Sequence, residues 1–322
     1  MRLASLSLDL DNEWTYLRTH GDAGWESYPS YLDVVVPHVL RLLDERDLKI
    51  TFFIVGQDAT RPENRDALAA IPAAGHEIAN HSFQHEQWLH LYEAPQLDRE
   101  LAQAEEAIEG VTGVRTEGFR GPGYSLSTST LRVLVRRGYR YDASTFPTYL
   151  GPLARAYYFR TAKLSPEERE QRRKLFGTLR DGTRPVSPYR WQLDEGSILE
   201  LPVTTLPLFK IPFHLSYLLY LGAYSHLLAK LYFHKALWLC RLAGVQPSLL
   251  LHPLDFLGGD DCGSLSFFPA MRLGGELKRR RAGEFLDIYR RHFTVVPMGQ
   301  HVDAIERGSL PLRAPDFRDL SP

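Results

Sequence analysis

The chain has 322 residues, of which 44% are hydrophobic and 24% charged, and its formal net charge is −1. These values are those of an ordinary globular protein with a full core, and they exclude collagen-like and disordered chains. Lys and Arg number 38 against 39 for Asp and Glu, so there is no basic footprint and no nucleic-acid partner is expected. The two cysteines cannot form a disulfide framework and fit a reducing compartment.

The first 150 residues alternate short apolar runs with helical patterns, which is typical of successive βαβ units. The sequence predicts strands at 3–10, 50–55, 76–79 and 118–120, and helices at about 31–46, 62–73, 95–110 and 127–137. The alternation resumes with strands at 248–252 and 294–298 and a helix at about 276–292. We therefore expect one α/β domain over residues 1–322 in which both groups of strands complete one sheet or barrel.

Residues 150–195 interrupt this alternation. Ser165 followed by Pro166 and Glu168 is typical of an N-cap, a proline in the first turn and a capping-box glutamate. The helix predicted to begin there carries a run of basic residues: Arg169, Arg172, Arg173 and Lys174. Such a run indicates either a solvated helix face or a rim that holds an anionic group of a substrate.

A second insertion covers about 205–245 and is strongly apolar. Residues 211–229 contain no Asp, Glu, Lys or Arg over 19 positions, which reaches the lower limit for a membrane span. A single span would separate His252 from the N-terminal strands, so we expect a helical hairpin joined near Lys230 and ending near Leu242. The hairpin is interpreted as a buried pair, an oligomer interface, or a lid that contacts a membrane through 206–242.

The N-terminal sequence has no long apolar stretch followed by a cleavage site, so no signal peptide is expected. The expected location is therefore the cytoplasm, and peripheral contact with the inner membrane face is left open by the hairpin.

Two acidic residues and two histidines suggest a metal site. Asp9 and Asp11 share one face of the first strand and repel each other unless a cation or a proton intervenes. His81 and His85 are spaced i and i+4, and on a helical turn they would face the same way. Together with Asp11 they would leave coordination positions open, as in catalytic zinc sites, and cobalt, nickel or iron would suit similar ligands.

Three further polar residues lie at strand ends. Arg120 is in a Gly/Pro-rich turn directly after a strand, where it could pair with a carboxylate at the same end of the sheet. Asp142 follows another short strand, and His252 ends a late apolar strand. Taken alone, His252 is equally well interpreted as a core histidine whose hydrogen bonds are made within the protein.

The order of these motifs resembles the polysaccharide deacetylase family, carbohydrate esterase family 4, over most of 3–146 and again over about 198–300. The resemblance implies a distorted (β/α) barrel and a catalytic domain that carries the two insertions. It also implies roles for individual residues: Asp9 as catalytic base; Asp11, His81 and His85 as metal ligands; Arg120 as the group that holds the base; His252 as general acid; Asp142 as the group that orients and charges this acid; and the backbone N–H of Gly123, next to Tyr124, at the oxyanion.

The sequence departs from the family pattern at three places. Leu10 separates the two aspartates and Asn12 follows them, where the family has adjacent aspartates and a glycine; this is similar to a cytoplasmic subgroup. Gly123 replaces the usual aromatic residue, with Tyr124 one position later, and Phe146 replaces a tryptophan. The metal ligands are therefore intact while the substrate groove is altered.

The resemblance implies metal-dependent hydrolysis of an N-acyl group, acetyl or formyl, from an amino sugar. Residues 201–207 also resemble a segment of bacterial deformylases that act on a lipid-linked amino sugar, so a lipid-linked or cell-envelope glycan is a candidate substrate. One alternative is a cyclic amide or ureide hydrolase of the allantoinase-like branch, whose members commonly lack the complete metal triad. Another is a non-catalytic carbohydrate- or lipid-binding protein on the same scaffold.

Overall fold

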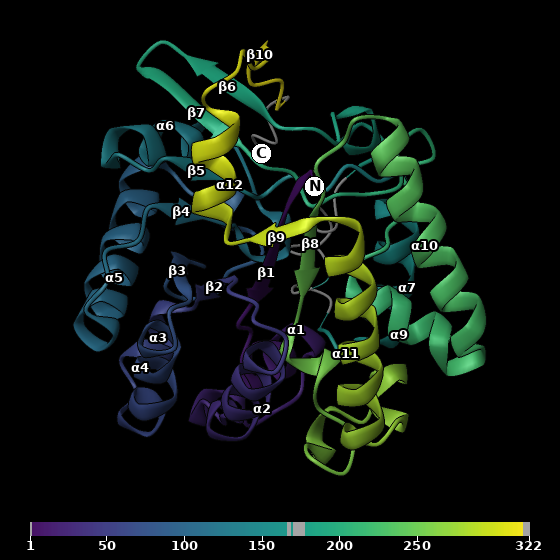
Figure 1. Cartoon of the computed structure of the whole chain (residues 1–322). Coiled ribbons are helices and arrows are strands. Elements are labelled where there is room, and N and C mark those ends of the chain that lie inside the picture. The colour runs from purple at the N-terminus through teal and green to yellow at the C-terminus, as the bar shows by residue number, and fades with distance from the viewer. Residues whose placement is uncertain (1, 166–168, 170–177, 318–322) are drawn as a thin grey trace.

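A computed structural model describes residues 2–165, 169 and 178–317 (Figure 1). Within these residues a single sheet of ten strands forms the centre of the molecule, in the order β10-β6-β7-β5-β4-β3-β2-β1-β8, with β9 paired to the start of β1. The strands are β1 (Leu3–Asp9), β2 (Thr51–Ile54), β3 (Glu77–Asn80), β4 (Gly118–Phe119), β5 (Tyr141–Asp142), β6 (Tyr189–Leu193), β7 (Gly196–Glu200), β8 (Ser248–Leu251), β9 (Thr294–Val296) and β10 (Leu312–Arg313).

Helices surround this sheet. They are α1 (Glu13–His20), α2 (Leu32–Asp44), α3 (Gly56–Ala59), α4 (Arg65–Ala73), α5 (Ala94–Thr112), α6 (Thr128–Arg137), α7 (Gly151–Thr161), α9 (Leu215–Tyr224), α10 (His226–Leu242), α11 (Gly275–His292) and α12 (Met298–Ile305). Figure 1 shows α3, α4 and α5 on one side of the sheet and α7, α9 and α10 on the other. Short 3-10 turns connect several of these elements.

The sheet is a distorted barrel, as expected. Strands β1 to β5, β7 and β8 pair in parallel, whereas β6 and β7 form an antiparallel hairpin that the sequence did not predict. After β7 the chain crosses to β8, where the N–H of Thr204 donates to the Ser248 carbonyl at 3.0 Å. The Ser248 N–H donates in return to Oγ1 of Thr204 at 2.8 Å. These hydrogen bonds join the two halves of the barrel.

The predicted elements before residue 150 are confirmed to within a few residues. The exception is the helix predicted at 62–73, which begins as a 3-10 turn (Pro62–Asn64) before α4. The parallel strands are short and almost wholly buried because helices cover them outside and side chains fill the barrel. At their carboxyl ends the chain leaves the sheet, and the polar residues singled out above follow these ends.

The second insertion forms the expected helical hairpin, but its break lies at Ser225 and not near Lys230. Ser225 has an extended backbone and its hydroxyl accepts the N–H of Leu228, so it ends α9 and caps α10. The helix α10 ends at Leu242, as predicted. In the described residues no helix is long and apolar enough to cross a membrane. The basic helix predicted after Ser165 lies outside the described residues, apart from Arg169.

Candidate active site

Asp11, His81 and His85 meet in one place at the carboxyl ends of β1 and β3. Their ligand atoms all lie within 4.8 Å of one another, and this is the group that could hold a metal ion. Oδ1 of Asp11 lies 3.2 Å from Nε2 of His81 and 3.0 Å from Nε2 of His85. Both histidines are buried, with 1% and 7% of their surfaces exposed. One carboxylate oxygen therefore faces two imidazole nitrogens, as a tetrahedral metal site requires.

The two histidines converge through a bent loop and not through the helical turn that their spacing suggested. No helix covers 81–85, and Ser82 and His85 have φ angles of 63° and 53°, in the left-handed region. The hydroxyl of Ser82 accepts the N–H of His85 at 3.1 Å and holds this conformation. Side chains other than glycine are uncommon there, so the loop stores backbone strain at the site.

The histidines are prepared for ligation through Nε2. Nδ1 of His81 lies 2.7 Å from the Arg120 carbonyl, so the proton belongs on Nδ1 and the Nε2 lone pair faces Asp11. Burial by itself would raise the pKa of Asp11, but His85 and His81 outweigh it and hold this pKa well below its usual value. Asp11 is therefore an anionic ligand, and the three side chains present fit a divalent cation.

Asp9 lies beside this group and is held by Arg120. Nη1 of Arg120 donates to Oδ1 of Asp9 at 2.5 Å and to the Ser7 hydroxyl at 3.0 Å. Nε of the same guanidinium donates to the Ala143 carbonyl at 3.0 Å, and the group lies over the Phe53 ring. Arg120 is fully buried and Asp9 is 4% exposed. The arginine thus fixes the position of one Asp9 oxygen with a charge-assisted hydrogen bond.

His252 follows β8, and its partners are Ser216 and Asp255. Nδ1 of His252 lies 3.2 Å from the hydroxyl of Ser216, and the His252 backbone N–H donates to Oδ2 of Asp255 at 2.8 Å. Burial raises the pKa of Asp255, and this is the largest effect on that carboxyl group. Ser216 also hydrogen-bonds Asp255, and this contact lowers the pKa because it favours the ionised carboxylate. Ser216 therefore connects the imidazole to a buried carboxyl group.

The expectation that Asp142 orients His252 stays a prediction, because the hydrogen bonds of Asp142 in the described structure go to other residues. Asp142 hydrogen-bonds the N–H and hydroxyl of Ser144 and the carboxyl group of Glu200, its register partner in β7. Burial raises the pKa of both carboxyl groups, and the repulsion from Asp142 adds to the shift at Glu200. The pair therefore shares a proton inside the barrel. The sequence could not show this because β7 was not predicted.

The residues that end β1 and β8 lie at one edge of the barrel, because these strands pair in parallel with Leu8 opposite Leu251. The hydroxyl of Tyr16, on α1, is buried, which raises its pKa strongly, and Asp11, Asp255 and Asp9 add to this shift. The ring of Tyr16 is thus close to both the metal ligands and the support of His252. Tyr16 carries no signal in the sequence, because it looks like any apolar helix position.

Gly123 and Tyr124 form the turn after Arg120 with φ angles of 58° and 62°. The Tyr124 ring stacks on Phe146 at 4.7 Å, and the Asp9 and Asp11 charges add to the effect of burial in raising its pKa. Tyr124 and Phe146 therefore make an aromatic wall beside the carboxylates. The backbone N–H of Gly123 remains a predicted oxyanion donor.

The insertion contributes two side chains to the site, and neither of them was predicted from the sequence. They are Ser216, described above, and His214, whose ring lies 5.6 Å from Phe146 and 6.0 Å from His252 between ring centres. The available signal was a histidine and a serine in an otherwise apolar segment that begins a helix.

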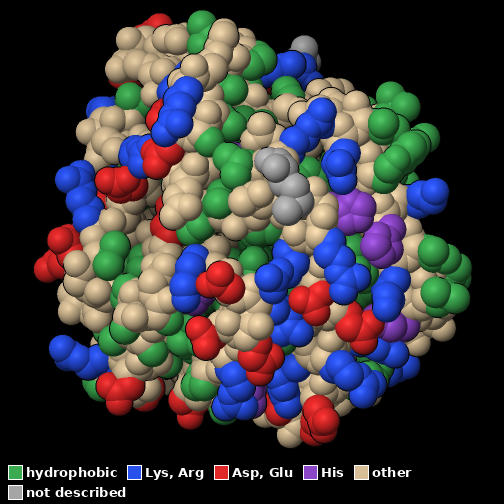
Figure 2. All heavy atoms as spheres, in the orientation of Figure 1, with side chains coloured by type: hydrophobic (Ala, Val, Ile, Leu, Met, Phe, Trp, Pro, Cys, Tyr) green, Lys and Arg blue, Asp and Glu red, His purple; other side chains and the backbone are tan. Residues whose placement is uncertain are grey.

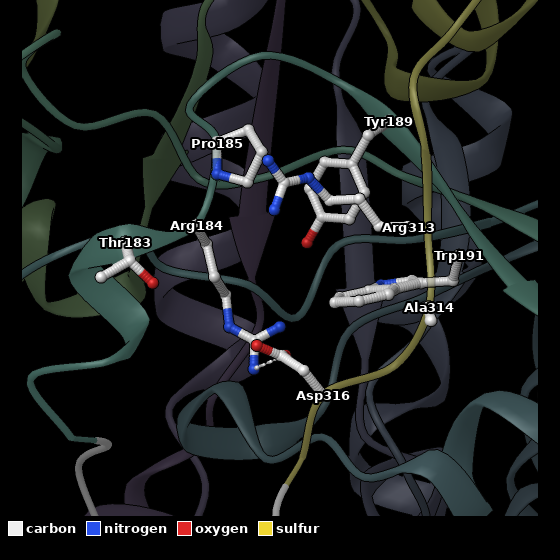
Figure 3. Close-up of a pocket in the computed structure, with 8 residues that line it drawn as sticks. All are labelled: Thr183, Arg184, Pro185, Tyr189, Trp191, Arg313, Ala314 and Asp316. Atoms are coloured by element: carbon white, nitrogen blue, oxygen red, sulfur yellow. Dashed lines mark ion pairs between the residues drawn. The ribbon is translucent and has the colours of Figure 1, made fainter.

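A separate cavity of about 240 Å³ lies near the other edge of the sheet (Figure 3). Arg184, Tyr189 and Arg313 line it, and Figure 3 shows Arg184 paired with Asp316, at 3.5 Å. The Arg184 guanidinium also lies over the Trp191 ring, at 5.2 Å. None of the residues that line this cavity belongs to the metal group or to the His252 cluster, so it is distinct from the candidate active site.

Comparison with known proteins agrees with this arrangement. Residues 22–141 match the family model for polysaccharide deacetylase. A peptidoglycan deacetylase of Helicobacter pylori is 27% identical over 165 residues, which are 49% of this chain and 53% of that protein. A peptidoglycan deacetylase-like protein of Gibberella zeae is 31% identical over 148 residues, which are 44% of this chain and 43% of that protein. The chain thus spans about half the length of the curated relatives it matches.

The fold has a counterpart over its whole length. A protein of Mycobacterium smegmatis assigned as a polysaccharide deacetylase superposes with a TM-score of 0.61 at 22% identity, covering 99% of this chain and 94% of that one. This likeness shows that the fold of the described barrel is shared with that protein. The family model and the two relatives support the polysaccharide deacetylase family, carbohydrate esterase family 4, for the matched part of the chain. The resemblance drawn from the order of the motifs is confirmed.

Proposed function

We propose that the chain is a metal-dependent hydrolase that removes an acetyl or formyl group from the nitrogen of an amino sugar. The observation that carries this proposal is the position of Asp9. Its carboxylate is fixed by the buried Arg120 beside the group formed by Asp11, His81 and His85. A held base next to an open metal site is the arrangement that amide hydrolysis by water needs.

In the proposed reaction, Asp11, His81 and His85 would hold the cation. A divalent ion bound there, zinc by default, supplies Lewis-acid polarisation of the acyl carbonyl and of a water molecule. Asp9 accepts the proton of the attacking water while Arg120 keeps its carboxylate in place. His252 donates a proton to the leaving amine, and Ser216 with Asp255 keeps its ring oriented.

The test replaces the base without touching the ligands. Asp9→Asn should lower the release of acetate or formate from a panel of soluble and lipid-linked amino sugars by about 10²–10⁴-fold, because one proton transfer is lost. The metal content per chain, measured on the same preparations, should stay unchanged. His81→Ala should lose both metal and turnover, while Asp33→Asn, on the outer helix α2, should alter neither.

Two results would contradict the proposal. Metal-loaded protein that releases neither acid from any member of the panel would be a binding protein on this scaffold. Equal turnover by the Asp9→Asn variant would remove Asp9 from the reaction.

We also propose that the amino sugar is carried by a lipid and that the protein works at the inner face of a membrane. Large apolar side chains are exposed along the hairpin and the loop before it, and we call this the hairpin surface: Leu208, Phe209, Ile211, Tyr217, Tyr220, Tyr224, Leu227, Leu228, Leu231, Trp238 and Leu242. Figure 2 shows hydrophobic side chains interspersed with Lys and Arg along the edge where Figure 1 places α10. Because residues 205–245 contain Lys210, Lys230, Lys235 and Arg241 but no acidic residue, anionic lipid headgroups complement this surface.

The free, buried Cys240 and Cys262 suit a reducing compartment.

A further inference from the structure

His214 is the residue with which the insertion enters the site. It lies directly before α9 and is 7% exposed. Its ring packs edge-on against Tyr217 at 4.8 Å and Phe146 at 5.6 Å between ring centres, and it faces His252 at 6.0 Å. The side chain is thus enclosed by aromatic residues of the proposed active site and by the proposed general acid.

Neither ring nitrogen of His214 has a hydrogen-bond partner among the residues that the structure describes. Nδ1 is enclosed by protein atoms and unpaired, while Nε2, also without a partner, is not enclosed. Burial, together with the smaller effect of the neighbouring His252, lowers the pKa of His214 to about 3. The ring is therefore neutral at ordinary pH and offers one donor and one acceptor that nothing in the described structure satisfies.

The usual structural explanations do not apply to this histidine. His214 occupies the N-cap position of α9, yet its side chain makes no capping hydrogen bond. Two residues further along the same helix, Ser216 does reach His252. A buried polar group without a partner destabilises the folded state, so such groups call for an explanation, and one explanation is a bound ligand.

We propose that His214 is a substrate-binding residue that hydrogen-bonds, through Nε2, an oxygen of the amino sugar next to the acylated nitrogen. This inference rests on the proposed amino-sugar hydrolysis. His252 would serve the leaving nitrogen, and His214, in contact range of the same ligand, would recognise the neighbouring substituent. The aromatic wall of Tyr124 and Phe146 would pack against the apolar face of the sugar ring. The insertion would thereby select sugars over simple acyl compounds.

The test compares a sugar probe with an acyl probe that has no sugar. For His214→Phe, we expect kcat/KM for triacetylchitotriose to fall about 10-fold, mainly through KM, because one hydrogen bond is lost. Hydrolysis of 4-nitrophenyl acetate by the same variant should change less than twofold. The thermal midpoint of the variant should rise, because an unpaired buried polar group is removed. His214→Gln, which keeps a donor and an acceptor, should recover part of the sugar activity.

A matched control lies in the same hairpin. His226, on α10, also has an unpaired Nδ1, but its Nε2 pairs with Glu284 at 2.9 Å. His226→Phe should lower the thermal midpoint and leave the ratio of the two activities unchanged. If His214→Phe reduces both activities equally, or lowers the midpoint with no change in the ratio, His214 is a support of the site and the inference is overturned.

A failure of the proposed function gives a different result. If the unaltered protein hydrolyses neither probe and releases neither acid from any member of the amino-sugar panel, the hydrolase proposal fails. Calorimetric binding of triacetylchitotriose then tests the role of His214 separately. Binding that is about 10-fold weaker in His214→Phe supports the inference. Equal binding by both proteins, or no binding by either, overturns it.

Discussion

At the scale of single residues, the proposed acid differs from the proposed base in how it is held. Asp9 receives a direct charge-assisted hydrogen bond from Arg120, whereas His252 contacts its buried carboxyl group through the hydroxyl of Ser216. A hydroxyl can accept the Nδ1 proton and donate its own to Asp255 at the same time. Ser216 is thus a positioning residue supplied by the insertion.

Ser216→Ala tests this connection. Removing the hydroxyl takes away the acceptor that stabilises the protonated ring, so we expect kcat to fall about 10-fold and the alkaline limb of the kcat profile to move to lower pH. The measurement is acetate release as a function of pH. Asp142→Asn serves as the comparison, because Asp142 pairs with Glu200 and its loss should lower stability without moving that limb. A shifted limb in Asp142→Asn alone would support the sequence-based assignment.

The sequence predicted the site residues whose positions depend only on the parallel strands. Asp9 ends β1, and Asp11 and Arg120 follow β1 and β4. The carboxyl ends of these strands meet at one edge, so the order of the residues along the chain was sufficient. The partner of Asp142 depends on β7, a strand from an antiparallel hairpin with no clear pattern. His214 and Ser216 lie in an insertion, and the spacing of residues in the sequence does not determine where this insertion packs on the barrel.

At the scale of elements, helix ends were predicted where local chemistry marks them. The helix α6 ends at Arg137 and is capped by Gly138, whose φ of 79° suits a residue without a side chain. The histidine pair was assigned to a helical turn because spacing is the only signal in the sequence. In the structure the hydroxyl of Ser82 accepts the backbone N–H of His85, which a helical turn would use for its own hydrogen bond, and the loop is bent as a result.

The hairpin surface gives a prediction at this scale. Replacing Leu227 and Leu231 by Glu should reduce binding to phosphatidylglycerol vesicles by at least about 10-fold, because two exposed leucines, 67% and 51% accessible, can no longer be buried in lipid. Cosedimentation with vesicles measures the effect. Binding by the unaltered protein should weaken at high salt and on phosphatidylcholine, because the basic residues contact anionic headgroups.

The matched control for this experiment is Leu312→Glu, a leucine of similar exposure, 63%, on β10. It should leave vesicle binding unchanged. Equal loss in both proteins would indicate a general effect of charge. A dimer that dissociates in the double variant, with no lipid binding by either protein, would assign the hairpin surface to a second copy of the chain.

At the scale of the whole molecule, helix α12 ties the late part of the chain to the first strand through a buried histidine. Nδ1 of His301 lies 3.1 Å from the hydroxyl of Ser5, and Nε2 lies 2.9 Å from Oε1 of Gln246. His301 is fully buried, and burial lowers its pKa to about 4. The barrel therefore depends on an imidazole that must stay neutral.

This histidine makes folding stability depend on pH. Between pH 6.5 and 4 the unfolded chain binds a proton at His301 while the native state does not, so the free energy of unfolding falls as pH falls. The expected slope from this one group is about 1.4 kcal/mol per pH unit across that window. Asp58, whose pKa burial raises to about 7, acts in the opposite direction, so the effect must be isolated by substitution.

The comparison is urea unfolding of the unaltered protein and of His301→Gln at pH 7, 6 and 5, with a chelator present throughout to exclude metal release. The variant should be less stable at pH 7, because two hydrogen bonds are disturbed, but the difference should shrink steadily toward pH 5. Ile288→Val, a substitution in the core that removes no titratable group, should keep a constant difference. A constant difference for His301→Gln as well would mean that the imidazole binds its proton equally in the folded and unfolded states, which would contradict the lowered pKa of a buried ring.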